Sequence, residues 1–128
     1  MKKKVLIVVA SYYENIADSL LKSAKIKLKN KCNINVIRVP GAFEIPVTIA
    51  KNLKKFNGFV ALGCVIKGQT PHFDFISKST TDALMMLSIT SKKPVGNGVI
   101  TCLNKKQAVK RGNKGSEAAE AVLSVLFQ

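Results

Sequence analysis

The sequence of 128 residues has one histidine, three cysteines and no long apolar run, and each scarcity excludes a class of protein. Cys32, Cys64 and Cys102 are an odd number without C-x-x-C spacing, and a single histidine cannot complete a zinc site with them. Free thiols in a reducing cytoplasm are the simplest interpretation. No segment reaches the roughly 18 to 20 apolar residues of a membrane span. We therefore expect no metal site and no membrane partner.

The first ten residues, MKKKVLIVVA, imitate a secretory signal, but the apolar core is short and no cleavage signal follows. Glycine and proline are too few for a low-complexity chain, and no repeat or linker is visible. A chain of this length buries about two thirds of the surface that its unfolded form exposes. We expect a single domain over residues 1–128, located in the cytoplasm.

Acidic residues are also scarce, 7 against 21 basic ones, which gives a formal charge of +14. Nineteen of the basic residues are lysines, and only Arg38 and Arg111 can make bidentate contacts. The lysines are spread along the chain, in runs typical of wet helix faces, and no tract interleaves them with aromatics. We therefore expect no nucleic-acid partner, and an RNA-binding module is the least favoured alternative. The charge does predict attraction for small anions, including phosphorylated metabolites.

Four short apolar segments have the pattern of strands that are covered on both faces. They are residues 5–10, 34–39, 59–66 and a stretch around Val99. Helical periodicity predicts helices over residues 14–29 and over about 73–91, 105–111 and 116–127. A further helix is predicted to follow the PGAFEIP turn, with Ile45, Ile49, Leu53 and Phe56 on its apolar face. Because strands and helices alternate, parallel pairing with right-handed crossovers follows. The sequence predicts an α/β, three-layer α/β/α sandwich with a four-stranded parallel sheet, flavodoxin-like.

In such sheets the ligand site lies beyond the carboxyl ends of the strands, where two familiar phosphate motifs fail. Residues 63–70, GCVIKGQT, nearly form a phosphate loop, but Gln69 replaces the lysine that would reach the phosphates. SYYEN follows the first strand in place of a glycine-rich dinucleotide turn, and it also lacks the acidic cluster of a receiver domain.

The only histidine, His72, lies on this edge, after the third strand. Thr70 is a plausible N-cap and Pro71 a plausible first helical residue, which places His72 in the first turn of a helix. The helix dipole there disfavours imidazolium, and neutral imidazole suits proton transfer. The alternative is a structural histidine that fixes a loop by hydrogen bonding.

Other candidates on the same edge have two interpretations each. Glu44 is either a ligand contact or a carboxylate that complements a helix dipole. GNKG puts Lys114 ahead of a helix N-terminus, directly after Arg111, which predicts either an anion site or a capping turn. Tyr13 is as readily a core residue as a platform for a ligand.

The segments VPGAFEIP, ALGCVIKGQTPHFDFIS, PVGNGVIT and GNKGSEAAEAVLSV occur in the order and spacing of the lumazine synthase family, which the chain resembles over almost its whole length. The resemblance implies a transferase of riboflavin biosynthesis. The implied reaction condenses 5-amino-6-ribitylaminouracil with 3,4-dihydroxy-2-butanone 4-phosphate, releases phosphate and water, and gives 6,7-dimethyl-8-ribityllumazine. It uses no metal or redox cofactor.

The resemblance also implies a role for each matching site residue. His72 would transfer protons, and Tyr13 would stack on the pyrimidine. The ribityl chain would be held by Ala42, Phe43 and Glu44, and the heterocycle would contact Cys64, Val65 and Ile66. The phosphate would be bound by Gln69, Thr70, Arg111 and Lys114. The implied partner is the same chain in a homo-oligomer, a pentamer with sites between subunits, in which Asn97, Arg111 and Lys114 serve the neighbouring pocket.

Three departures from the family pattern stand in this sequence. Asn97 occupies a usual phenylalanine position, Tyr13-Glu14 replaces Phe-Asn, and about five residues are missing between Arg111 and Gly112. These departures leave open an alternative, a catalytically impaired assembly or scaffold protein of the same fold.

Overall fold

The computed structural model describes residues 2–128 as alternating strands and helices. The strands are β1 (Lys3–Ala10), β2 (Cys32–Val39), β3 (Gly58–Ile66) and β4 (Val95–Cys102), and the helices are α1 (Glu14–Leu28), the 3-10 turn η1 (Ala42–Glu44), α2 (Ile45–Lys51), α3 (His72–Ser91), α4 (Lys105–Val109) and α5 (Lys114–Leu126). All strand pairs are parallel, in the order β2-β1-β3-β4. This order agrees with the flavodoxin-like, doubly wound arrangement.

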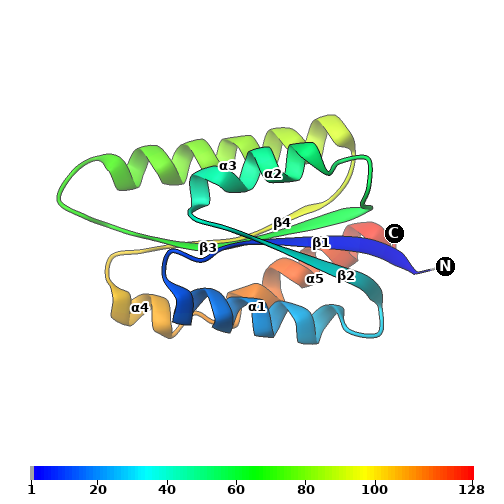
Figure 1. The fold of residues 1–128 in the computed structure, drawn as a ribbon, viewed down its shortest axis with the longest axis horizontal. Coiled ribbons are helices and arrows are strands. Elements are labelled where there is room, and N and C mark those ends of the chain that lie inside the picture. The colour runs from blue at the N-terminus through cyan, green and yellow to red at the C-terminus, as the bar shows by residue number, and fades with distance from the viewer. Residues whose placement is uncertain (1) are drawn as a thin grey trace.

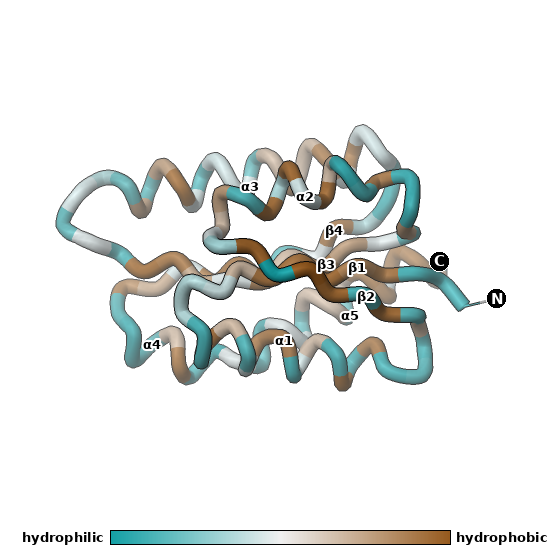
Figure 2. Tube along the Cα trace, viewed as in Figure 1, coloured by the Kyte–Doolittle hydropathy of each residue, from teal (hydrophilic) through white to brown (hydrophobic). Residues whose placement is uncertain are grey.

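The sheet forms the middle of three layers (Figure 1). Helices α2 and α3 cover one face, and α1, α4 and α5 cover the other. The predicted α/β/α sandwich is therefore confirmed. Figure 2 shows the hydrophobic strands in the middle layer, between helices of mixed hydropathy.

The N-terminal apolar run is the central strand of the core. Along β1, Leu6 and Val8 pack under α2 and α3, whereas Ile7 and Val9 pack under α1 and α5, and all four are fully buried. The run that imitates a secretory signal is thus explained by burial on both faces of a strand. Among residues 2–128 no helix is long and apolar enough to cross a membrane.

The second crossover helix is shorter than its periodicity predicts. Helix α2 ends at Lys51, where the Asn52 side chain donates a hydrogen bond to the Thr48 carbonyl. Leu53 and Phe56, predicted on the helix, lie in the connection to β3 and still pack into the core. Hydrophobic spacing therefore identified the buried residues correctly, although a turn presents two of them.

Helix α5 lies unusually close to its neighbours. A Cβ on Gly96 of β4 would lie 2.2 Å from the Ala118 carbonyl oxygen, and one on Gly115 would lie 2.0 Å from the Leu20 carbonyl oxygen. Because α5 already begins at Lys114, half of the GNKG segment predicted as a loop belongs to the helix. Glycines thus let α5 contact both β4 and α1 at backbone distance.

Candidate functional site

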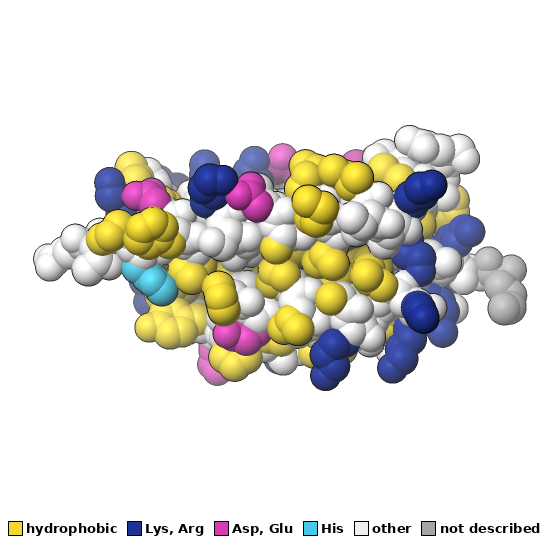
Figure 3. Space-filling view, turned by 90° about the horizontal axis from the view of Figure 1, so that it is seen from above, with side chains coloured by type: hydrophobic (Ala, Val, Ile, Leu, Met, Phe, Trp, Pro, Cys, Tyr) yellow, Lys and Arg dark blue, Asp and Glu magenta, His cyan; other side chains and the backbone are white. Residues whose placement is uncertain are grey.

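A cavity of about 590 Å³ opens at the carboxyl ends of β1, β2 and β3. It is lined by Tyr12, Tyr13, Gly41, Ala42, Phe43, Cys64, Val65, Ile66, His72 and Ile76. Seven of these residues were predicted as site residues from the sequence, and three segments far apart in the chain contribute them. Figure 3 shows the histidine among hydrophobic side chains at one end of the molecule.

The segment after β2 is held in shape by Glu44. One carboxylate oxygen of Glu44 accepts a hydrogen bond of 3.0 Å from the Gly41 N–H, and the Glu44 N–H donates to the Gly41 carbonyl at 3.2 Å. This reciprocal pair closes η1 and leaves Phe43 exposed at the cavity. Glu44 itself does not line the cavity, and its carboxylate occupies the Gly41 N–H.

His72 is the first residue of α3, and its side chain is exposed at the cavity. The Thr70 hydroxyl accepts a hydrogen bond of 3.4 Å from the His72 N–H, and the Phe75 N–H donates to the Pro71 carbonyl. Pro71 is the N-cap rather than the first helical residue, yet Thr70 still supplies the expected side-chain acceptor. The imidazole therefore projects from a helix N-terminus into an apolar cavity.

The two adjacent tyrosines do different things. The Tyr12 side chain is 76% exposed, whereas Tyr13 packs against the core beneath α1, and their rings meet edge to face at 4.9 Å. Burial raises the pKa of the Tyr13 hydroxyl, with a smaller contribution from Tyr12. Tyr12 therefore presents a free ring that the sequence reasoning missed. The signal was there, because Tyr13 continues the buried helical spacing of Ile16, Ala17 and Leu20.

The last residues of β3 form the cavity wall. Cys64, Val65 and Ile66 are half-buried, in contrast to the fully buried residues before them. Burial, with a smaller contribution from the neighbouring thiol of Cys102, raises the pKa of Cys64 to about 12. The Cys64 thiol is thus protonated near pH 7, so it contributes shape rather than a nucleophile.

The remaining predicted residues lie outside this cavity. Gln69 and Thr70 are exposed in the loop between β3 and α3, and the Asn97 side chain on β4 accepts a hydrogen bond from the Val99 N–H at 3.0 Å. Arg111 and Lys114 bond to groups of their own chain and are not among the residues that line the cavity.

Arg111 is fixed against the carboxyl end of β4. Its guanidinium donates to the Thr101 carbonyl at 3.1 Å and lies 3.8 Å from the Cys102 sulfur. Lys114 pairs with Glu117 at 3.3 Å within the first turn of α5, rather than standing in a loop before it. Within residues 2–128 no group of three histidine, cysteine or acidic side chains is arranged for a metal ion.

Sequence comparisons agree on one family. Residues 2–128 match the family described as 6,7-dimethyl-8-ribityllumazine synthase. Relatives with that name include proteins of Bartonella tribocorum, 44% identical over 137 residues (98% of this chain, 91% of the relative), and Agrobacterium fabrum, 43% identical over 138 residues (98% and 93%). Another, named 6,7-dimethyl-8-ribityllumazine synthase 1, from Rhodopseudomonas palustris, is 41% identical over 136 residues (96% and 83%). These alignments exceed the 128 residues of the chain, so the relatives carry residues that this chain lacks.

Proposed function

This chain belongs to the 6,7-dimethyl-8-ribityllumazine synthase family, and we propose that its cavity condenses 5-amino-6-ribitylaminouracil with 3,4-dihydroxy-2-butanone 4-phosphate. The chain is accordingly a transferase of riboflavin biosynthesis. The observation that carries the assignment to this cavity is the convergence of Tyr12, Phe43 and His72 with the end of β3 around one space of about 590 Å³.

The apolar part of the cavity suits the flat heterocycle. Tyr12 offers an exposed ring held edge to face by Tyr13, so we assign stacking on the pyrimidine to Tyr12, with Tyr13 as its support. The backbone of β3 at Cys64–Ile66 borders the ring edge, and the η1 turn borders the ribityl chain. Glu44 contributes by closing η1 and so positions Phe43.

The proposed reaction requires that the two substrates be positioned and that protons be transferred. Both substrates are reactive, so holding the amine against the carbonyl supplies much of the acceleration. An imine forms with loss of one water, phosphate leaves, and the ring closes with loss of a second water. His72 contributes the imidazole on the cavity wall, and we assign it to moving protons in these steps.

We propose that groups of two subunits bind the phosphate of the butanone substrate. Gln69 and Thr70 stand in the exposed loop beside His72. Arg111 uses one guanidinium nitrogen on Thr101 and retains other N–H groups for an anion. Because Arg111, Lys114 and Asn97 do not line the cavity of their own chain, we propose that they serve a neighbouring copy. We also place the reaction in the cytoplasm, where three free cysteines stay reduced.

An oligomer is supported by α3, the longest helix. Of its 20 residues only Thr80 and Leu84 are buried, and Ser77 and Thr80 each have a buried hydroxyl oxygen without a partner among residues 2–128. Large apolar side chains remain exposed along it: Phe75, Met85, Met86 and Ile89. Figure 3 shows hydrophobic side chains gathered over this face. We propose that this face packs against further copies in a pentamer.

Ile89→Glu is expected to dissociate the oligomer, because it places a charge where apolar surface is buried between copies. Ile26→Glu on α1 is the matched control, since Ile89 and Ile26 are 64% and 66% exposed and lie on opposite layers. Sedimentation velocity measures the oligomeric state of both variants. Dissociation by Ile26→Glu but not by Ile89→Glu would place the interface elsewhere.

The proposed activity is tested by mixing the purified protein with the two substrates and following lumazine absorbance above the uncatalysed rate. Product above background supports the proposal. The background rate alone, from a correctly assembled oligomer, would favour an assembly protein without catalysis, an alternative that no observation of the fold or the comparisons favours.

A further inference from the structure

The lysines that are scattered along the sequence are gathered by the fold. The four segments that precede the strands all lie at the amino end of the sheet, away from the cavity. These segments and the adjoining helix ends carry ten lysines: Lys2, Lys3, Lys4, Lys29, Lys31, Lys51, Lys54, Lys55, Lys92 and Lys93. We call this surface the basic end. Figure 3 shows Lys and Arg side chains clustered there, next to the N-terminus.

Hydrogen bonds make the basic end one continuous surface. The Lys4 N–H donates to the Asn57 side chain and the Asn57 N–H donates to the Lys4 carbonyl, both at 2.8 Å. The Phe59 N–H donates to the Pro94 carbonyl at 2.9 Å, and Lys3 pairs with Cys32 in the sheet register. The lysine-bearing segments before all four strands are therefore tied side by side.

None of these ten lysines forms an ion pair among residues 2–128, and the carboxylate of Glu120, which lines a groove with Lys31, pairs with Lys27 instead. The seven acidic residues of the chain are Glu14, Asp18, Glu44, Asp74, Asp82, Glu117 and Glu120. All lie in helices or in η1, and four of them, Glu14, Glu44, Asp74 and Glu117, stand in a first turn. The four ion pairs among residues 2–128 join other cations. Nine of the ten lysines are exposed, and Lys93, half-buried, donates to the Leu53 carbonyl.

The composition of the surface indicates the chemistry of a partner. Lysine ammonium groups bind phosphate oxygens as point charges, without the bidentate geometry by which arginine reads a guanine edge. The tips of these segments carry lysine and asparagine, such as Asn30 and Asn52. One exposed aromatic ring, that of Phe127 at the end of α5, lines a groove together with Lys31, and a ring beside lysines can stack on a base. The arrangement fits a flexible chain of phosphates better than a lipid surface.

We propose that the basic end binds the phosphate backbone of single-stranded nucleic acid, without sequence preference. This inference is independent of the cavity and of its chemistry. If about five of the lysines contact phosphates at once, the logarithm of the affinity falls with the logarithm of salt concentration with a slope of roughly −3.5. Each doubling of salt then weakens binding about tenfold. RNA and DNA of equal length bind alike, because a lysine does not read the 2′-hydroxyl group.

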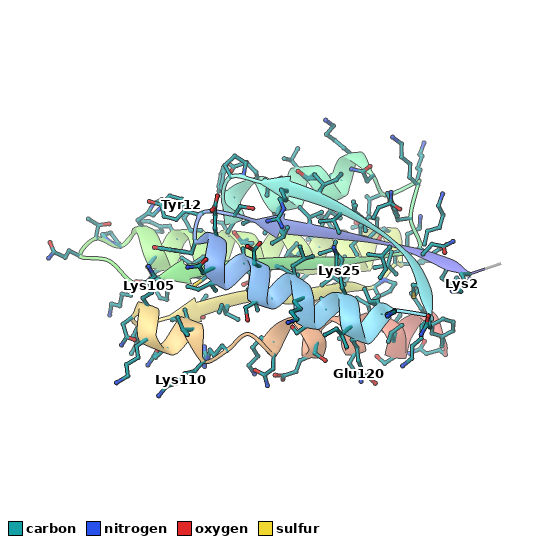
Figure 4. The ribbon with its side chains drawn as sticks, turned by 60° about the horizontal axis from the view of Figure 1, so that its bottom comes forward. Lys2, Tyr12, Lys25, Lys105, Lys110 and Glu120 are labelled. Carbon is teal, nitrogen blue, oxygen red and sulfur yellow. The ribbon has the colours of Figure 1, made fainter. Side chains whose placement is uncertain are left out.

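The test measures fluorescence anisotropy of a labelled 20-nucleotide single strand of mixed sequence, as RNA and as DNA, at several salt concentrations. The basic-end variant carries Lys31→Glu, Lys54→Glu and Lys55→Glu. The control carries Lys105→Glu, Lys106→Glu and Lys110→Glu, which change the net charge equally at the other end of the molecule, as Lys2, Lys105 and Lys110 in Figure 4 show. Lumazine formation by both variants checks that they are folded.

The basic-end variant is expected to bind at least roughly 20-fold more weakly than the unaltered protein at equal salt, with a shallower slope, whereas the control changes less than about threefold. Equal losses in both variants would show attraction by net charge alone and overturn the proposal. So would absence of binding to either strand, or binding only to vesicles that contain phosphatidylserine, which would assign the basic end to a lipid surface.

Discussion

Gly96→Ala is expected to destabilise the fold by about 3 kcal/mol, because there is no room for a methyl group between β4 and α5. The added Cβ would lie 2.2 Å from the Ala118 carbonyl oxygen and 2.9 Å from a Val122 methyl group. Helix α5 cannot retreat easily, because its Gly115 already touches the backbone of α1. Strand β4 and α5 must therefore separate, and core contacts along both elements weaken.

Thermal unfolding measures this effect, with a decrease in the midpoint of roughly 10 °C or more expected at a fixed protein concentration. Gly68→Ala is the control, since a Cβ there meets no atom within 4 Å and its effect should be close to zero. A midpoint for Gly96→Ala that equals that of the control would mean that α5 adjusts at little cost. The close packing would then not limit stability.

His72→Ala is expected to lower kcat by roughly 10²-fold or more while leaving a rate above background. The imidazole moves protons between groups that the cavity already holds in register, so its loss removes only one part of the acceleration. KM should change much less than kcat, because Tyr12, Phe43 and the end of β3 still hold the substrates. Steady-state kinetics of lumazine formation separates the two parameters.

Asp74→Ala is the matched control for His72, since Asp74 stands two residues later in the same helical turn and does not line the cavity. Its kcat should stay within about twofold of the unaltered protein. Complete loss of activity in His72→Ala, with native assembly and ligand binding, would show that more than proton transfer depends on the imidazole. An unchanged kcat would assign His72 to the structure of the loop.

The layer order and the edge that carries the cavity were predictable because they follow from strong local signals. Apolar runs such as residues 5–10 and 59–66 indicate strands buried on both faces. Right-handed crossovers between such strands favour a parallel sheet with helices on both faces. The carboxyl ends of these strands then fall together. Phe43, Cys64 and His72 thus share a cavity although they are far apart in sequence.

What the sequence did not reveal depends on contacts between distant segments. Helix α2 ends early because Asn52 caps its last turn, a choice that hydrophobic spacing does not report. Lys114 enters α5 because the helix must reach α1 at Gly115. Tyr12 and Tyr13 differ only in the direction that each side chain takes at the start of α1.

The predicted solvated face is confirmed for Lys22, Lys25 and Lys29, which are exposed, but local patterns do not show how the fold gathers lysines at one end. Read along the chain, they resemble solvated helix faces, as in residues 22–31. Only the parallel topology brings the segments before the four strands to one end of the sheet. Nearest-neighbour patterns cannot show such a collection, because it arises from pairings between residues more than 20 positions apart.

The parallel sheet also insulates its two ends from each other. Strands of eight or nine residues separate the basic end from the cavity by about 25 Å. At 0.1 M salt this is more than twice the Debye length of about 10 Å, so charges at one end have little influence on an anion at the other. Charge substitutions in the loops of the basic end therefore have little electrostatic effect on groups at the cavity. Evolution can rewrite the contacts that this protein makes with its surroundings while its active site stays unchanged.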